Sequence, residues 1–122
     1  MKKIFFIILA CTVLSFQAAH AQNSEPQFFT SLHDVPLMEG LNEIDTEATA
    51  YDKPNGRIID AFAYTGSLSP NAIMSYYNST LPQFGWGKTD NGTFYREQEI
   101  MRISFEKHEG AHIVKISIRP SL

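Results

Sequence analysis

The residues that most directly suggest catalysis form the string His108-Glu109-Gly110-Ala111-His112, which matches the H-E-x-x-H pattern of zinc proteases. In those enzymes a helix places both histidines on one face, where they bind the metal. Here the string lies between two alternating segments and has glycine at its centre, which is typical of a hairpin. No third ligand follows, because the polar residues after it are only Lys, Ser and Arg. We therefore predict no metal site, and a small metal-dependent hydrolase that uses this segment is an alternative function.

Other polar groupings match no reaction centre. Glu43, Asp45 and Glu47 alternate over a short acidic segment, but they lack the ligand spacing and central glycine of an EF-hand calcium loop. The serines between positions 67 and 79 have no Gly-x-Ser-x-Gly setting, in which a strained turn exposes a hydrolase nucleophile. The sequence therefore predicts a non-enzymatic chain with no catalytic residue and no cofactor.

The first 21 residues have the three parts of a bacterial secretory signal peptide. Lys2 and Lys3 give a basic start, residues 4–16 form an uncharged and mostly apolar run, and Ala19-His20-Ala21 fits a cleavage site. The apolar run is shorter than the roughly 20 residues that a spanning helix needs. We therefore predict cleavage after Ala21, a periplasmic or secreted location, and no transmembrane span in the mature chain.

A second processing route is open at Cys11. The segment Ile8-Leu9-Ala10-Cys11 loosely matches a lipoprotein processing site, at which the cysteine would be lipidated. That route would leave an apolar stretch directly after the lipid and give Ala19-His20-Ala21 no role. Cleavage after Ala21 instead removes the one cysteine of the chain, so the mature chain has no disulfide and depends on its hydrophobic core.

The charge of the chain is acidic and unevenly distributed. The formal net charge is −3, and loss of the signal peptide leaves 8 basic against 13 acidic residues, a net charge of −5. Eight of the acids lie between positions 25 and 60, where Lys53 and Arg57 are the basic residues. Nucleic-acid binding would need clustered Lys and Arg, so we predict no nucleic-acid partner.

Residues 22–45 show no sustained periodicity. They begin with a polar leader and continue into Asp34–Leu41, which mixes apolar residues with proline and glycine. We predict an irregular loop that covers the domain, in which Val35, Leu37, Met38 and Leu41 need burial. Two interpretations are open for these side chains, namely capping of the core and docking to a partner.

Residues 46–122 are predicted to form the α+β domain. Strands are expected over 46–52 and 57–65, joined by a turn at Lys53-Pro54-Asn55-Gly56. Ser69-Pro70 then provides an N-cap and a first helical residue, and Pro82 ends the regular helix near position 80 or 81.

Four further strands complete the predicted sheet. A short strand at 86–88 and its return at 93–97 flank an Asn-Gly turn, and alternating segments around 101–106 and 114–119 flank the turn at Glu109-Gly110. The order β-β-α-β-β-β-β predicts a single antiparallel sheet with one helix packed against one of its faces. The opposite face of the sheet is expected to be wholly or partly exposed to solvent.

The alternation of side chains predicts which sheet face carries function. Ile59, Ala61 and Ala63 share a face whose small alanines favour close packing of the helix. The opposite face and the sheet edges are then the surfaces for a peptide or an envelope protein. The predicted binding residues on that face are Phe62, Tyr64, Arg102 and Lys115.

Several segments resemble a family. Asp34–Leu41, Gly56-Arg57-Ile58 and Tyr76–Trp86 (YYxxTLPxxGW) together resemble a group of small exported alphaproteobacterial proteins of unassigned function. The resemblance spans most of the mature chain, rests on structural motifs and implies no activity. At the level of fold, the strand–helix–Gly-aromatic–hairpin pattern is similar to that of the lipoprotein in the outer-membrane β-barrel assembly complex. We therefore expect a non-enzymatic periplasmic binding or accessory module, with a lipid-anchored envelope assembly factor as a further alternative.

Overall fold

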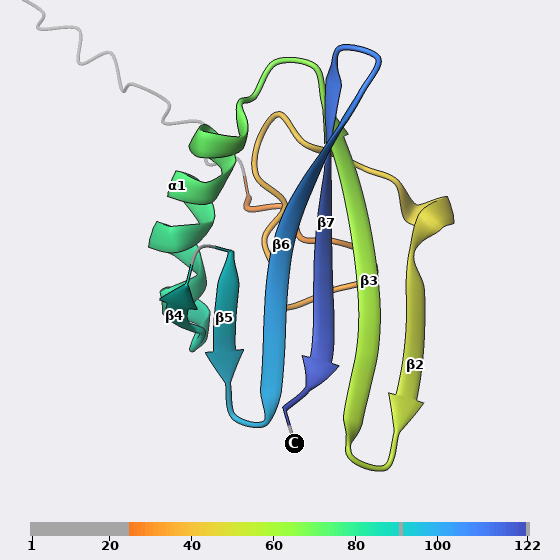
Figure 1. The fold of residues 1–122 in the computed structure, drawn as a ribbon, viewed down its shortest axis with the longest axis vertical. Helices are drawn as coiled ribbons and strands as arrows, with labels where there is room; N and C mark the ends of the chain where they lie inside the picture. Colours follow the sequence, from red (N-terminus) through yellow and green to blue (C-terminus); the bar gives the residue numbers. More distant parts are fainter. Residues whose placement is uncertain (1–24, 91, 122) are drawn as a thin grey trace, which may run out of the picture.

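The fold is one antiparallel sheet with a helix and an irregular segment on the same face (Figure 1). The computed structural model describes residues 25–90 and 92–121, so the predicted signal peptide and Cys11 lie outside the described residues. The elements are β1 (Asn42–Glu43), the 3-10 helix η1 (Asp45–Glu47), β2 (Thr49–Lys53), β3 (Gly56–Thr65), α1 (Pro70–Thr80), the 3-10 helix η2 (Leu81–Phe84), β4 (Gly87–Asp90), β5 (Thr93–Arg96), β6 (Glu99–His108) and β7 (Ala111–Pro120).

Three long strands form the centre of the sheet. The spatial order is β1-β3-β7-β6-β5-β4, and β2 pairs with β3 along the same edge as β1. Every pairing is antiparallel, with Ala61 opposite Ile116 and Ile116 opposite Ile103 at the middle. The predicted α+β class and element order are confirmed, with the two-residue β1 added at the start.

Two predicted strand boundaries were wrong for local reasons. The strand expected from Thr46 begins at Thr49, because η1 occupies residues 45–47 and the Ala48 amide donates to the Asp45 carbonyl. The strand expected from Trp86 begins at Gly87, because the Trp86 amide donates to the Leu81 carbonyl and closes the turn after η2. Trp86 itself is buried in the core.

The helix starts and ends where its sequence signals predict. The Ser69 hydroxyl accepts a hydrogen bond from the Ala72 amide at 3.1 Å, and Pro70 is the first helical residue. The α-helix ends at Thr80, and Pro82 lies in η2. Gly85 follows with φ of 87°, a left-handed conformation that favours glycine.

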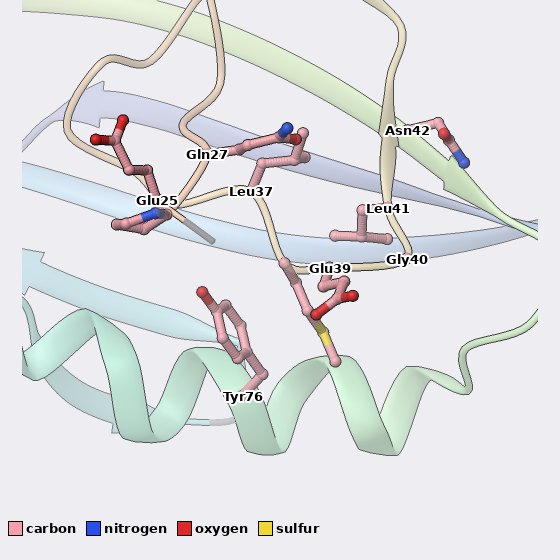
Figure 2. A pocket seen from close by; sticks show the side chains of 10 residues that line it. Glu25, Gln27, Leu37, Glu39, Gly40, Leu41, Asn42 and Tyr76 are labelled. Carbon is pink, nitrogen blue, oxygen red and sulfur yellow. The ribbon is translucent and has the colours of Figure 1, made fainter. Parts of the chain in front are cut away.

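Residues 25–41, which we call the strap, cover the part of the sheet that the helix does not reach. Figure 1 shows the strap crossing β6 and β7 beside α1, and Figure 2 shows it between the strands and the helix. Phe29, Leu32 and Val35 of the strap are fully buried in the same core as Ile73 of the helix. The alanines of β3 lie on this covered face as predicted, but the cover consists of the strap as well as the helix.

The Tyr77 hydroxyl joins the helix to the strap. It donates to the Pro36 carbonyl at 2.8 Å and accepts from the Met38 amide at 3.4 Å. Burial raises the pKa of Tyr77 well above its usual range, so the hydroxyl is protonated at neutral pH and can donate to the Pro36 carbonyl.

The substitution Tyr77→Phe tests this link. It keeps the ring but leaves the buried Pro36 carbonyl without its donor, so we expect a loss of about 1–3 kcal/mol in the free energy of unfolding. The measurement is urea unfolding at neutral pH. Tyr76→Phe is the matched control, because the half-buried Tyr76 hydroxyl has no hydrogen bond within the described chain. Equal losses for the two variants would contradict the role of Tyr77.

Candidate functional site

The sheet face opposite α1 and the strap has no covering layer in the described part of the chain, and we call it the open face. Its side chains follow from the strand registers, in which directly opposite residues share a face. On the three long strands they are Ile58, Asp60, Phe62 and Tyr64 of β3, Ile113, Lys115, Ser117 and Arg119 of β7, and Ile100, Arg102, Ser104 and Glu106 of β6.

All four predicted binding residues lie on this face. Phe62 is directly opposite Lys115, whose Nζ lies 5.8 Å from the centre of the Phe62 ring, a cation–π distance. Tyr64 is two residues further along β3. Arg102 is diagonal to Lys115, because Ser104 is opposite Lys115 and Arg102 is opposite Ser117. The structure therefore places two cations and two aromatic rings on one continuous surface.

Exposed tyrosines extend this surface beyond the predicted residues. Tyr51 is 63%, Tyr64 47% and Tyr95 42% exposed, and all three lie on the open face. Tyr51 is opposite Ile58, and Tyr95 is opposite Ile100. The sequence analysis did not select Tyr51 or Tyr95. The alternation of side chains along the strands that flank the predicted turns at residues 53–56 and 89–92 was the signal that could have placed both on this face.

The open face is locally basic on an acidic chain. Its three long strands carry Arg102, Lys115 and Arg119 against Asp60 and Glu106. Arg119 forms an ion pair with Asp60 at 3.0 Å, whereas Arg102 and Lys115 have no ion-pair partner among the described residues. These two cations are therefore available to an anionic ligand.

A small hollow lies on the open face, on the half nearest the turn between β6 and β7. Its volume is about 210 Å³, and its lining consists of Phe62, Ser104, Phe105, Glu106, Ile113 and Lys115, so one carboxylate and one ammonium group both border it. Sites for drug-sized molecules have volumes of about 300–1,000 Å³, so this hollow fits a single side chain better than a metabolite. The open face is thus suited to a macromolecular partner that inserts one residue.

A second, larger groove of about 500 Å³ lies between the strap and α1 (Figure 2). Leu37, Met38 and Leu41 supply apolar lining, and Tyr76 rises from the helix towards the strap. Carboxylates of Glu25 and Glu39 are at the groove, and its lining includes no basic side chain. Its chemistry is therefore opposite in sign to that of the open face.

A cluster of four charged side chains lies at one end of the covered face. Arg57 donates from Nε to Glu99 at 2.6 Å and from Nη2 to Asp34 at 3.1 Å. Arg96 donates to the same two carboxylates and lies over the Trp86 ring, 4.2 Å from its centre. The sequence analysis did not identify this cluster, because Asp34 and Arg57 are far along the chain from each other and from the Arg96–Glu99 pair.

The cluster holds the strap rather than presenting a catalytic group. Partial burial alone would raise the pKa of Asp34, but the hydrogen bonds from Arg96 and Arg57 outweigh it and hold that pKa below its usual value of 3.8. The hydrogen bond to Glu99, opposed by partial burial, raises the pKa of Arg57. Because each carboxylate already accepts from both arginines, neither is a free general base.

The histidine string is a hairpin, as predicted. His108 ends β6, and Ala111 begins β7. His112 is opposite Lys107, the neighbour of His108, so the two histidines project from opposite faces of the sheet and do not share a metal ion. Within residues 25–90 and 92–121, no group of three His, Cys, Asp or Glu side chains is placed to hold a metal.

The substitution Asp34→Asn tests whether the cluster anchors the strap. The folded-state pKa of Asp34 is below the usual 3.8, so its ion pairs stabilise fully above that value and are lost as the pH falls through the folded-state pKa. We expect the variant to lose about 1–2 kcal/mol at neutral pH, with solvent screening limiting the loss. The difference from wild type should shrink as the pH falls below 3.8.

The measurement is urea unfolding in pH steps. Asp45→Asn is the matched control, because Asp45 is exposed in η1 and has no ion pair within the described chain. A difference between wild type and Asp34→Asn that does not change with pH would contradict the assignment.

Comparison with known proteins gives no family for this chain. No protein-family model matches it, and no match was found among curated proteins or among solved structures. The resemblance to small exported alphaproteobacterial proteins therefore stays a prediction. The functional argument depends on the residues of the open face.

Proposed function

We propose that this chain is a non-enzymatic binding module of the bacterial cell envelope, exported and processed after Ala21, which holds an acidic segment of another envelope protein on its open face. The observation that carries the proposal is the placement of Arg102 and Lys115, without ion-pair partners in the described chain, among exposed tyrosines on one sheet face. The location follows from the sequence features of residues 1–21.

Aromatic residues supply the affinity in this proposal. A buried aromatic side chain removes roughly 150–250 Å² from water, at about 25 cal/mol per Å². Tyr51, Tyr64 and Tyr95 are 63%, 47% and 42% exposed, so each has about that fraction of the area left to bury. Tyrosine is enriched where partners bind, because its ring is apolar and its hydroxyl can form hydrogen bonds with a partner or with water.

The two cations determine which kind of partner segment is preferred. An exposed ion pair contributes about 0–1 kcal/mol, so Arg102 and Lys115 add little to affinity by themselves. They favour an acidic segment over a basic one and raise the association rate in a salt-dependent way. A segment that places one apolar side chain in the hollow and its carboxylates on the Arg102 side, away from Glu106, would fit this face.

The alternatives from the sequence analysis have less support. The hydrolase would need His108 and His112 on one face, and they lie on opposite faces. The lipid-anchored assembly factor differs from the proposal in its attachment at Cys11, which the mass of the mature N-terminus tests. None of the described helices has the length and apolar character needed to cross a membrane.

Site-specific photocross-linking in intact cells tests the binding surface. A photoreactive phenylalanine analogue in place of Tyr64 samples the open face, and the same analogue in place of Tyr76 samples the groove of Figure 2. We expect the first to capture an envelope protein through an acidic segment, which mass spectrometry of the cross-linked peptide identifies. Capture from position 76 alone would place the binding site in the groove and overturn the proposal.

Charge reversal then tests the two cations. We expect Arg102→Glu and Lys115→Glu each to weaken binding of the captured acidic peptide by about tenfold, because charge reversal replaces a weak attraction with a repulsion of similar size. Salt should weaken the wild-type complex. Lys88→Glu is the matched control, because it changes the net charge equally at an exposed residue opposite Phe94, on the other side of the sheet. Equal effects of all three variants would show that net charge and not the open face controls binding. Circular dichroism checks that each variant is folded.

A further inference from the structure

The two outer edges of the sheet differ in how they are protected. Edge strands expose unpaired backbone groups, and proteins protect them by shortness, bulges or covering elements. At one edge, β4 has four residues, a register shift between Lys88 and Asp90, and contacts with η2. At the other edge, β2 has five residues in uninterrupted register with β3, and all five are exposed. Figure 1 shows β2 at the rim of the sheet.

The backbone groups that point outward from β2 can be identified. The Ile44 amide donates to the Phe62 carbonyl at 2.8 Å, so the Phe62 carbonyl points towards this edge. Hydrogen-bonded pairs alternate along antiparallel strands, so Asp60, Ile58 and Gly56 of β3 also point there and bond to Thr49, Tyr51 and Lys53. The N–H and C=O groups of Ala50 and Asp52 therefore point away from the sheet.

From this edge we infer that β2 pairs antiparallel with β2 of a second copy of the chain, about a two-fold axis at Tyr51. Ala50 of each copy then bonds with Asp52 of the other, which satisfies all the outward groups of both strands with about four backbone hydrogen bonds. Tyr51 lies opposite Tyr51 of the second copy in a close, non-hydrogen-bonded pair. The inference goes beyond the proposed function and does not depend on it.

The charges of β2 favour this register over its neighbours. Asp52 is opposite Ala50 and Lys53 is opposite Thr49, so no like charges meet. A shift towards the turn would place Asp52 opposite Asp52 and Pro54 opposite Ala50, where proline has no N–H to donate. A shift the other way would place Asp52 opposite Ala48, which follows η1 and is not part of the strand.

The proposed pairing makes the binding surface larger. Directly opposite residues of antiparallel strands share a face, so the open faces of the two copies would form one surface with the Tyr51 pair at its centre. Two five-residue strands bury less than the roughly 1,200–2,000 Å² of a standard interface. We therefore expect a dimer that dissociates on dilution.

Cysteine substitution tests both the dimer and its register. In a Cys11→Ser background an introduced cysteine is the one thiol of the chain. For Tyr51→Cys the two Cα atoms would lie about 4.5 Å apart, within the range that a disulfide spans. For the control Thr49→Cys, on the same face of β2, they would be displaced by four residues, about 13 Å.

We expect the purified processed chain with Tyr51→Cys to form a disulfide-linked dimer at least about tenfold faster than Thr49→Cys. Ala50→Pro removes an outward N–H and no bond to β3, so adding it should slow the cross-linking by a similar factor. Sedimentation of the wild-type chain between about 10 µM and about 1 mM should show reversible dimerisation.

Equal cross-linking rates for the two cysteines, or a wild-type chain that stays monomeric over this concentration range, would overturn the inference. In intact cells, a disulfide from Tyr51→Cys to a different envelope protein in place of the dimer would also overturn it, because a foreign strand would then occupy the edge. These outcomes are separate from those of the Tyr64 cross-linking, so either proposal can fail alone. The cysteine comparison still decides the matter if Ala50→Pro does not fold.

Discussion

The structure depends on covering one face of a sheet whose strands are longer than its helix. α1 has 11 residues and a length of about 16 Å, whereas the ten-residue strands β3, β6 and β7 each extend about 33 Å. The strap covers the remaining apolar surface, and because it has little regular structure its backbone groups need specific partners. Tyr77 supplies partners to the Pro36 carbonyl and the Met38 amide, and Glu43 accepts from the Thr30 and Ser31 amides. The arginines of the charged cluster hold the strap through the Asp34 side chain instead.

One-sided covering leaves the open face free of packing requirements. Each long strand buries alternate residues in the core, so its other residues can change without creating a cavity. Phe62 and Tyr64 thus lie on the solvent side of β3, whereas Ala61 and Ala63 between them are fully buried. Large aromatic side chains are on the solvent side and small ones in the core of this strand, the reverse of what core packing alone favours.

Local patterns in the sequence predicted local structure, and long-range contacts were missed. Ser69-Pro70, the alternation in β6 and β7, and the glycine in the histidine string each specify structure within a few residues, and each prediction is confirmed. The burial of Phe29 and Leu32 was missed, because no periodicity marks a residue in an irregular strap. The contact of Asp34 with Arg96 joins residues 62 positions apart, which spacing rules do not address.

The distribution of charge links the strap to the open face. Glu25, Asp34, Glu39 and Glu43 all lie on the strap and β1, on the covered side of the sheet, whereas Arg102 and Lys115 project from the other side. Asp34 is paired with Arg57 and Arg96, but Glu25 and Glu39 have no ion-pair partner in the described chain, so the unpaired charge of the groove is negative. Arg102 and Lys115 outnumber Glu106 among the unpaired charges of the three long strands on the open face. A field of this kind attracts an acidic segment to the open face and repels it from the groove beside α1. In the proposed function, the carboxylates of Glu25 and Glu39 at the groove would thereby direct an acidic segment to the opposite face, where the tyrosines are exposed.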